Sequence, residues 1–442
     1  MTKAMTQPKP IKVVVATDLH LMAPALMIRE GSAFQRVLDS DRKLLVESEC
    51  IFDALISEIE GIGPDLVLIP GDLTKDGELI SHELMAQKLG ILKDKGIKCC
   101  VIPGNHDINN PQARYYNGDE YTPTERVTPQ DFERIYLRFG YDPKEIISRG
   151  PNLSYVAQPL SDMWVMGVDS CLYQDNIELN YPTPKGAIST ETLQWMVEMS
   201  AKAKEADKQL VVMMHHNLLE HFPFQSVIAS EYVVRDWVHV ASVLSDAGIK
   251  VVFTGHFHAQ NIVGKRFRNG LIYDVETGSI VTYPCPYREV DFTPNELTIT
   301  THYLSLPLDQ LNGKTLQEYA YNHLKEGIPG MAKYLANYTR INHPDIYSED
   351  KVNMILEMVP AFTPLIMDIY TGHLAGDQSG LRYNPNHNEV EKNPMSGDLF
   401  QQLKRFISYS SPKLIPIFDV IEGILHSGIC GDNNLVLQLS RK

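Results

Sequence analysis

Residues 65–77 read DLVLIPGDLTKDG, and residues 97–107 read IKCCVIPGNHD. Each stretch starts with a short apolar run containing β-branched residues and then reaches a glycine followed by polar side chains. Such a pattern predicts a buried strand that ends in a sharp turn. Comparable apolar runs lie at 12–17, 163–168, 209–214 and 250–253, and two further runs at 271–275 and 297–303 suggest additional sheet.

Helical patterns separate most of these runs. Apolar residues recur at helical spacing in 42–60, 189–206 and 230–247. The alternation of strands and helices predicts an α/β architecture in which the sheet is largely buried.

Residues 314–407 differ in character, because helical patterns alternate with polar loops and strand patterns are scarce. We expect residues 1–305 to form one domain and residues 306–442 a second, mostly helical domain, which serves either as a cap over a site or as a homodimer contact. Four polar residues of the second domain are either substrate contacts or solvated loop positions: His373, Asp377, Arg382 and His387.

The charge balance restricts the partners. Of 442 residues, 40 are Lys or Arg and 55 are Asp or Glu, which gives a formal net charge of −15. An acidic surface repels phosphate backbones, so long nucleic acid is not expected as a partner. The six cysteines form no C-x-x-C pair, no apolar stretch reaches 18 residues, and the N-terminus is polar. We therefore expect no membrane segment and a cytoplasmic location, with a secretory or lipoprotein leader outside the given sequence as the alternative.

Polar motifs follow five of the predicted strands. They are Asp18-Leu-His20, Gly71-Asp72, Gly104-Asn-His-Asp107, His215-His216 and Gly255-His-Phe-His258. Neighbouring parallel strands deliver their carboxyl ends to one edge of a sheet, so the five motifs are expected to meet in space.

The residue types in these motifs favour a metal site. Carboxylates, imidazoles and one amide oxygen, without thiolates, suit Mn²⁺, Fe, Zn²⁺ or Co²⁺. In an extended segment alternate side chains share a face, so both polar residues of D-x-H and of H-x-H can point into the same pocket. Each motif alone is weak, whereas five motifs at five strand ends predict a metal centre.

Taken together, D-x-H, GD, GNHD, HH and GHFH resemble the motifs of the calcineurin-like metallophosphoesterases. GDLTKDG followed by VIPGNHD is most similar to the class III cyclic-nucleotide phosphodiesterase branch. The resemblance covers residues 11–305 and implies a four-layer α-β-β-α sandwich, with the mostly helical C-terminal domain following it.

The resemblance also implies two divalent metal ions. One would be bound by Asp18, His20 and His258, the other by Asn105, His215 and His256, with Asp72 bridging the two. His215 is expected rather than His216, because it directly follows the apolar strand; His216 is the alternative.

A mechanism follows from this resemblance. A metal-bound hydroxide would attack the phosphorus directly, without a phospho-enzyme. His106 would lie over the scissile bond and protonate or hydrogen-bond the leaving oxygen. Asp107 could orient His106, or it could be a turn-forming aspartate.

Departures from other branches narrow the expected substrate. Lys75 stands where purple acid phosphatases carry a tyrosine, and GNHD differs from the GNHE of protein Ser/Thr phosphatases. We expect a phosphodiesterase acting on a small phosphorylated substrate such as a cyclic nucleotide. The alternatives are a phosphomonoesterase or nucleotidase of the same superfamily and a non-catalytic scaffold, which the complete set of ligand-type residues disfavours.

Overall fold

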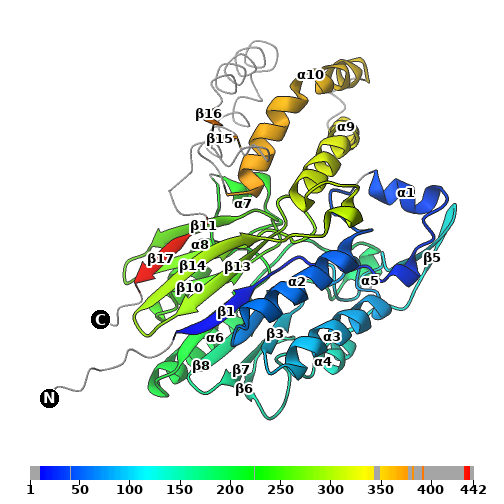
Figure 1. Cartoon of the computed structure of the whole chain (residues 1–442). Coiled ribbons are helices and arrows are strands. Elements are labelled where there is room, and N and C mark those ends of the chain that lie inside the picture. The colour runs from blue at the N-terminus through cyan, green and yellow to red at the C-terminus, as the bar shows by residue number, and fades with distance from the viewer. Residues whose placement is uncertain are drawn as a thin grey trace.

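The computed structural model describes residues 10–39, 41–222, 224–342, 349–376, 381–382, 391–392 and 433–438. Two β-sheets pack face to face, and helices cover their outer faces (Figure 1). Strand β2 lies against β9 and strand β3 against β8, so the two sheets enclose a common core. The expected α-β-β-α sandwich is confirmed.

The first sheet has six strands. Their order is β17 (Leu435–Gln438), β14 (Glu296–Tyr303), β13 (Pro286–Phe292), β1 (Ile11–Val15), β2 (Leu66–Pro70) and β3 (Lys98–Ile102). Strands β1, β2 and β3 are parallel, and β13 pairs with β1 in the antiparallel direction. Helices α2 (Ser48–Ile62) and α3 (Leu79–Asp94) pack together over this sheet.

The second sheet has seven strands. Their order is β11 (Asn261–Arg266), β12 (Leu271–Glu276), β10 (Val251–Thr254), β9 (Gln209–Met214), β8 (Met163–Val168), β7 (Tyr155–Leu160) and β6 (Ile146–Arg149). Strands β8, β9, β10 and β12 are parallel. Helices α6 (Thr190–Glu205) and α8 (Trp237–Asp246) cover the outer face.

The core explains why these residues form strands. All five residues of β2 are buried, as expected for a parallel strand covered on both faces. One apolar cluster fills the space between the sheets, and a second lies between the second sheet and its helices, where Met196 and Leu244 pack near Trp164. Both sheets therefore bury two faces.

Local signals place several helix ends. Ser189 caps α6 by accepting a hydrogen bond from the Thr192 backbone, and Gly63 ends α2 with φ +61°, which a glycine adopts without steric cost. Helix α2 begins at Ser48, later than the helical pattern at 42–60, so Arg42 and Lys43 lie in the preceding loop.

Short elements connect the layers. They are η1 (Pro24–Leu26), α1 (Ser32–Leu38), the hairpin of β4 (Arg114–Asn117) and β5 (Glu120–Pro123), α4 (Pro129–Ile135), α5 (Asn176–Leu179), α7 (Gln225–Ile228) and η2 (Leu308–Leu311).

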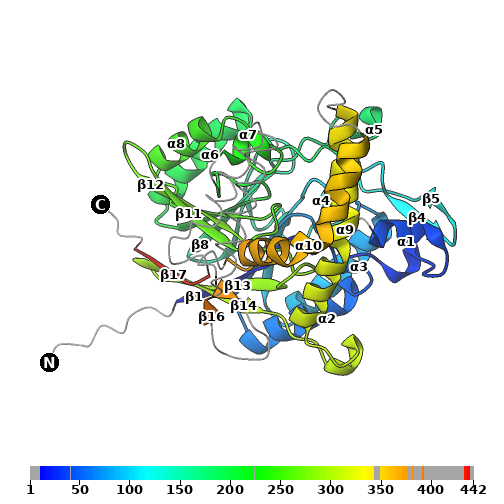
Figure 2. The same ribbon diagram turned by 90° about the horizontal axis from the view of Figure 1, so that it is seen from above.

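Two long helices follow the sandwich. Helices α9 (Leu316–Asn342) and α10 (Glu349–Leu374) pack against each other beside the two sheets (Figure 2), followed by the short pair β15 (Leu381–Arg382) and β16 (Glu391–Lys392). The helical pattern from Leu399 onward, Asp377 and His387 lie outside the described residues. The domain boundary near 305 and the cap or homodimer role stay predictions, although β17 pairs with β14 and so joins the end of the described chain to the first sheet.

The described helices include none that is both long enough and apolar enough to cross a membrane. All eight strand patterns of the sequence correspond to observed strands. Five further strands of the two large sheets were not predicted: β6, β7, β11, β13 and β17.

Candidate metal centre

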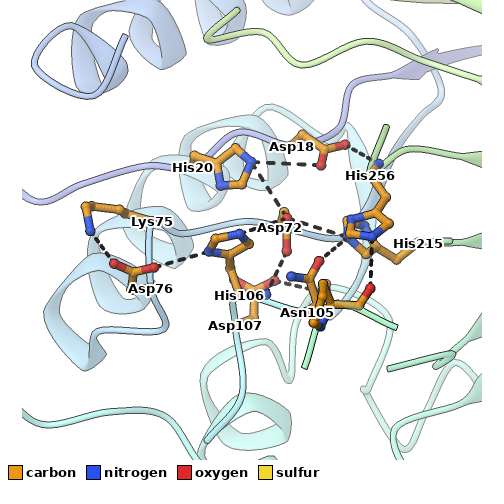
Figure 3. A network of polar contacts seen from close by, with 12 residues as sticks. Asp18, His20, Asp72, Lys75, Asp76, Asn105, His106, Asp107, His215 and His256 are labelled. Carbon is orange, nitrogen blue, oxygen red and sulfur yellow. Dashed lines mark hydrogen bonds and ion pairs between the residues drawn. The ribbon is translucent and has the colours of Figure 1, made fainter. Parts of the chain in front are cut away.

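Polar side chains from five strand ends meet at one place between the two sheets (Figure 3). Asp18 follows β1, Asp72 follows β2 and Asn105 follows β3, all in the first sheet. His215 follows β9 and His256 follows β10 in the second sheet. The convergence expected from the strand ends is therefore present, and it joins the carboxyl ends of both sheets.

One group of four side chains can offer ligand atoms to a single cation. Asp18, His20, Asp72 and His258 each have such an atom, and these atoms all lie within 4.8 Å of one another. Nε2 of His258 is 3.1 Å from Oδ1 of Asp18 and 3.1 Å from Nε2 of His20. Nε2 of His20 is 3.7 Å from Oδ2 of Asp72.

A second group adjoins the first. Asp72, His215 and His256 also offer ligand atoms within 4.8 Å of one another. Nε2 of His215 is 3.5 Å from Oδ2 of Asp72 and 3.0 Å from Oδ1 of Asn105. Asp72 belongs to both groups, which is the place expected of a carboxylate that bridges two cations. The two groups contain six of the seven ligands that the resemblance implied, and the seventh, Asn105, lies beside His215; metal binding itself stays a prediction.

The spacing and second contacts of these side chains fit cations. Ligands about 2.1 Å from a metal and about 90–110° apart lie roughly 3.0–3.4 Å from each other. Metal-binding histidines commonly donate their other ring N–H to a carbonyl. Nδ1 of His215 lies 2.9 Å from the Pro70 carbonyl oxygen, which leaves Nε2 for a metal. Nε2 of His256 lies 3.0 Å from the Pro184 carbonyl oxygen, which leaves Nδ1.

The family of the chain follows from comparison with known proteins. The family model described as calcineurin-like phosphoesterase matches residues 11–260. The chain belongs to this family. The family inferred from the motifs is therefore confirmed, and its members are metal-dependent phosphoesterases.

Individual relatives are more distant. A probable cyclic nucleotide phosphodiesterase of Fibrobacter succinogenes is 22% identical over 206 residues, 44% of this chain and 58% of that protein. One from Vesicomyosocius okutanii is 36% identical over 72 residues, 16% of this chain and 30% of that protein. The chain thus matches less than two thirds of the length of these relatives. A dimetal phosphatase from Danio rerio has a TM-score of 0.47 at 12% identity, covering 66% of this chain and 96% of that one.

Most of the expected ligands in this site have a backbone conformation that is unusual for residues other than glycine. Five of the seven expected ligands have a left-handed φ: Asp18 (53°), His20 (41°), Asp72 (48°), His256 (74°) and His258 (63°). Non-glycine residues adopt this region rarely and at a cost, and they concentrate at functional sites. The fold therefore imposes these conformations so that the side chains turn back toward one point.

Two glycines make room for the carboxylates. A Cβ atom on Gly104 would lie 2.1 Å from Oδ1 of Asp72, and one on Gly255 would lie 2.3 Å from Oδ2 of Asp18. Any side chain at these positions would displace the carboxylate that it meets. The glycines that precede the motif residues are thus required by close approach and not only by the turn.

The protonation states suit cation binding. Burial, with a contribution from Lys43, lowers the pKa of His20 well below its usual value, and burial with His216 does the same for His256. Neutral imidazoles have a lone pair for a metal. Burial opposes a charge on His215, but Asp72 raises its pKa to about 9. A cation at Nε2 of His215 would displace this proton, so cation binding is coupled to proton release.

The ring nitrogens of His216 contact groups outside the two ligand groups. Its Nδ1 lies 2.8 Å from the Ser170 hydroxyl and its Nε2 lies 3.0 Å from the Pro184 carbonyl oxygen. Both ring nitrogens are therefore engaged elsewhere, which favours His215 as the ligand of the pair.

The partner of His106 differs from the expectation. Nδ1 of His106 lies 3.2 Å from Oδ1 of Asp76, whereas its Nε2 lies 4.0 Å from Oδ2 of Asp72 (Figure 3). Asp107 does not orient this ring as expected. Its oxygens accept hydrogen bonds from the backbones of Leu73, Thr74 and Gly104, so it ties the GDLTKDG loop to the GNHD loop. Asp107 thus matches the other interpretation of the sequence, in which it is a turn-forming aspartate.

Other residues near the site were not singled out by the sequence. Asp76 and Lys75 lie inside the GDLTKDG motif, but nothing in the spacing distinguished Asp76 from Asp107 as the partner of His106. Arg42 donates a hydrogen bond to Tyr370 of α10, and the Tyr232 ring lies 4.9 Å from the His256 ring.

His373 was expected to be a substrate contact or a solvated loop residue, but it lies in a helix and is buried. It lies in the last turn of α10, buried, with its ring 5.1 Å from that of Phe257. Helix α10 therefore packs against the GHFH loop that carries His256 and His258.

Proposed function

We propose that the protein hydrolyses phosphodiesters with the help of two divalent cations and acts on small substrates such as cyclic nucleotides. The observation that carries this proposal is Asp72, whose carboxylate belongs to two adjacent groups of ligand-type side chains. A carboxylate shared by both groups would allow two cations to act on one phosphoryl group.

The cations supply the Lewis acidity of the reaction: when bound, they withdraw charge from the phosphoryl group and make water more acidic. Of the seven expected ligands, Asp18 and Asp72 are the two that carry a negative charge. Asn105 is neutral, and the other four are histidines. Two divalent cations exceed that charge, so the site attracts an anionic ester although the whole chain carries −15.

His106 is placed to handle the proton of the leaving group. Its side chain is 23% exposed, unlike those of Asp18 and His20, so a substrate can reach it. Nδ1 is held by Asp76, and Nε2 is directed toward the centre. Burial disfavours the imidazolium, but Asp72 and Asp76 raise the pKa of His106 above its usual value. A protonated His106 can donate to the leaving oxygen from Nε2.

The substrate class is proposed from the names of the relatives. Cyclic nucleotides are named for the relatives in Fibrobacter and Vesicomyosocius, and each relative is matched over only part of its length. The acidic net charge argues against long nucleic acids.

Hydrolysis assays test the proposal directly. Protein stripped with a chelator and reloaded with Mn²⁺, Fe²⁺, Zn²⁺ or Co²⁺ should hydrolyse bis(p-nitrophenyl) phosphate faster than p-nitrophenyl phosphate, and a panel of 3′,5′- and 2′,3′-cyclic nucleotides should contain a substrate. On a cyclic nucleotide, whose leaving alkoxide is strongly basic, His106→Ala should lower kcat by roughly 10²–10⁴ while metal content stays unchanged; the loss on bis(p-nitrophenyl) phosphate should be smaller, because its leaving group needs little protonation. His239→Ala, which alters an exposed histidine on α8, is the matched control.

Three results would contradict the proposal. A preference for the monoester would favour the phosphatase alternative. Loss of metal in His106→Ala would make His106 a ligand. Reloaded protein that binds no metal and hydrolyses no ester would favour the scaffold.

A further inference from the structure

A chain of buried polar contacts leads away from His106. Oδ1 of Asp76 lies 3.2 Å from Nδ1 of His106, and Oδ2 of the same carboxylate pairs with Nζ of Lys75 (Figure 3). Nζ of Lys75 also lies 3.2 Å from the hydroxyl of Tyr116 and 5.4 Å from the centre of its ring. The chain thus runs from Tyr116 through Lys75 and Asp76 to His106.

The members of this chain have little access to water. Lys75 and Asp76 are each 5% exposed and Tyr116 is 2% exposed. Buried charges are retained when they are paired and hydrogen-bonded, and removing one partner leaves the other uncompensated. Lys75 is the cation of this cluster, which also contains the buried Glu78. Without Lys75, the carboxylate of Asp76 would lose the partner that fixes one of its two oxygens.

The far end of the chain is anchored by packing. Tyr116 belongs to β4, outside both large sheets, and its ring lies 5.2 Å from that of Phe34 in α1. Tyr116 is thus packed in an apolar cluster with Phe34 and Met22, and it contributes no metal ligand itself. Nζ of Lys75 therefore contacts both Tyr116 and Asp76, and Asp76 in turn contacts Nδ1 of His106.

We propose that Lys75, anchored by Tyr116, is a positioning residue that acts on His106 through Asp76. The inference rests on the proposed function, because it assigns Lys75 to the step in which His106 donates a proton to the leaving oxygen. In this inference Lys75 and Asp76, and not Asp107, orient His106. The carboxylate of Asp107 instead accepts hydrogen bonds from the backbone of two loops.

The test compares two diesters that differ in the basicity of the leaving group. Bis(p-nitrophenyl) phosphate releases a weakly basic phenolate that needs little protonation, whereas diphenyl phosphate releases a more basic one. Lys75→Met removes the charge and keeps the aliphatic stem. It should lower kcat for diphenyl phosphate by about 10-fold, which is part of the ~10²–10⁴ that a proton donor contributes, and kcat for the nitrophenyl ester by less than about 3-fold. KM and metal content should not change.

Two further variants make the result specific. Lys88 is also buried and paired with two carboxylates, Glu49 and Asp53, but it joins α2 to α3 away from the centre. Lys88→Met should reduce stability without any dependence on the leaving group. Tyr116→Phe removes one contact of Lys75. It should also slow diphenyl phosphate more than the nitrophenyl ester, but with a smaller difference than Lys75→Met. It can therefore replace Lys75→Met if that variant does not fold.

The outcomes separate the inference from the proposed function. If wild-type protein hydrolyses neither ester, the proposed function is wrong. If wild-type protein hydrolyses both and His106→Ala shows the leaving-group effect, but Lys75→Met and Tyr116→Phe slow both esters equally or lose metal, the positioning role of Lys75 is wrong.

Discussion

Nε2 of His258 lies 3.1 Å from Oδ1 of Asp18, although 240 residues separate them in the chain. Asp18 follows β1 in the first sheet, and His258 follows β10 in the second. The candidate metal centre therefore spans the interface between the two sheets, and a cation held there would tie them together.

Metal binding should consequently stabilise the fold. A ligand that binds only the folded state at 100 times its Kd adds about 2.7 kcal/mol to the free energy of unfolding. Titrating chelator-treated protein with Mn²⁺ should raise Tm progressively, as measured by calorimetry. Asp72→Ala removes the shared carboxylate and should abolish this rise. An equal rise in the variant would show that the cation binds elsewhere.

The two adjacent histidines should respond differently to substitution. His215→Ala should lose at least one metal ion per chain and nearly all activity, because Nε2 of His215 points to Asp72 and Asn105. His216→Gln should retain its metals, because the His216 ring bonds to Ser170 and Pro184. Metal content measured by mass spectrometry distinguishes them, and loss of metal only in the His216 variant would reverse the assignment.

A glycine substitution should weaken metal binding without replacing any ligand residue. In Gly104→Ala the new Cβ would lie 2.1 Å from Oδ1 and 2.2 Å from the backbone nitrogen of Asp72, so Asp72 has to move and metal affinity should fall by at least ~10-fold, about 1.4 kcal/mol. Gly61→Ala is the matched control, because a Cβ there has open space in helix α2. The control should keep full activity and gain up to about 1 kcal/mol of stability. Normal calorimetric metal affinity for Gly104→Ala would contradict the packing.

The stability of the protein should fall as the pH rises from about 6.5 to about 9. His221 is buried, which disfavours its charge, but Asp274 at 3.1 Å and Glu276 at 3.5 Å raise its pKa from 6.5 to about 9. The folded state then holds a proton that the unfolded state releases, so this stabilisation is complete below 6.5 and is lost as the pH passes through about 9.

Urea unfolding at several pH values and fixed metal concentration measures this effect. His221→Gln should have a flatter dependence between pH 6.5 and 9 than wild type. Parallel curves for the two proteins would exclude His221 as the source of the slope.

His373 should be dispensable for catalysis. Its ring is buried between Phe222 and Phe257, and neither ring nitrogen has a hydrogen-bond partner among the residues that the structure describes. An unsatisfied buried polar group costs about 1–3 kcal/mol. His373→Leu should therefore raise the free energy of unfolding by about 1 kcal/mol and leave kcat unchanged. A large loss of activity would instead make His373 a substrate contact.

The sequence by itself determined most of the strands and the chemistry of the site, and the four layers came from the family resemblance. Strands such as 66–70 and 209–214 can be recognised from their own residues. A short run of apolar, β-branched residues is typical of a strand buried on both faces, whatever its position in the sheet. The polar motifs directly follow these strands, so the choice of Asp18, Asp72 and His258 as candidate ligands needed only the order of the chain and the resemblance that these motifs carry.

Only the tertiary structure decided which neighbour each side chain meets. Asp76 and Asp107 lie in adjacent loops and have the same chemistry, yet one faces His106 and the other faces backbone N–H groups. That choice depends on how two loops from different strands pack, as do the chain from His106 to Tyr116 and the contact of His373 with Phe257. Local sequence specifies backbone propensity and residue type, but contacts between distant segments are set by packing in three dimensions, where a change of a few ångströms selects a different partner.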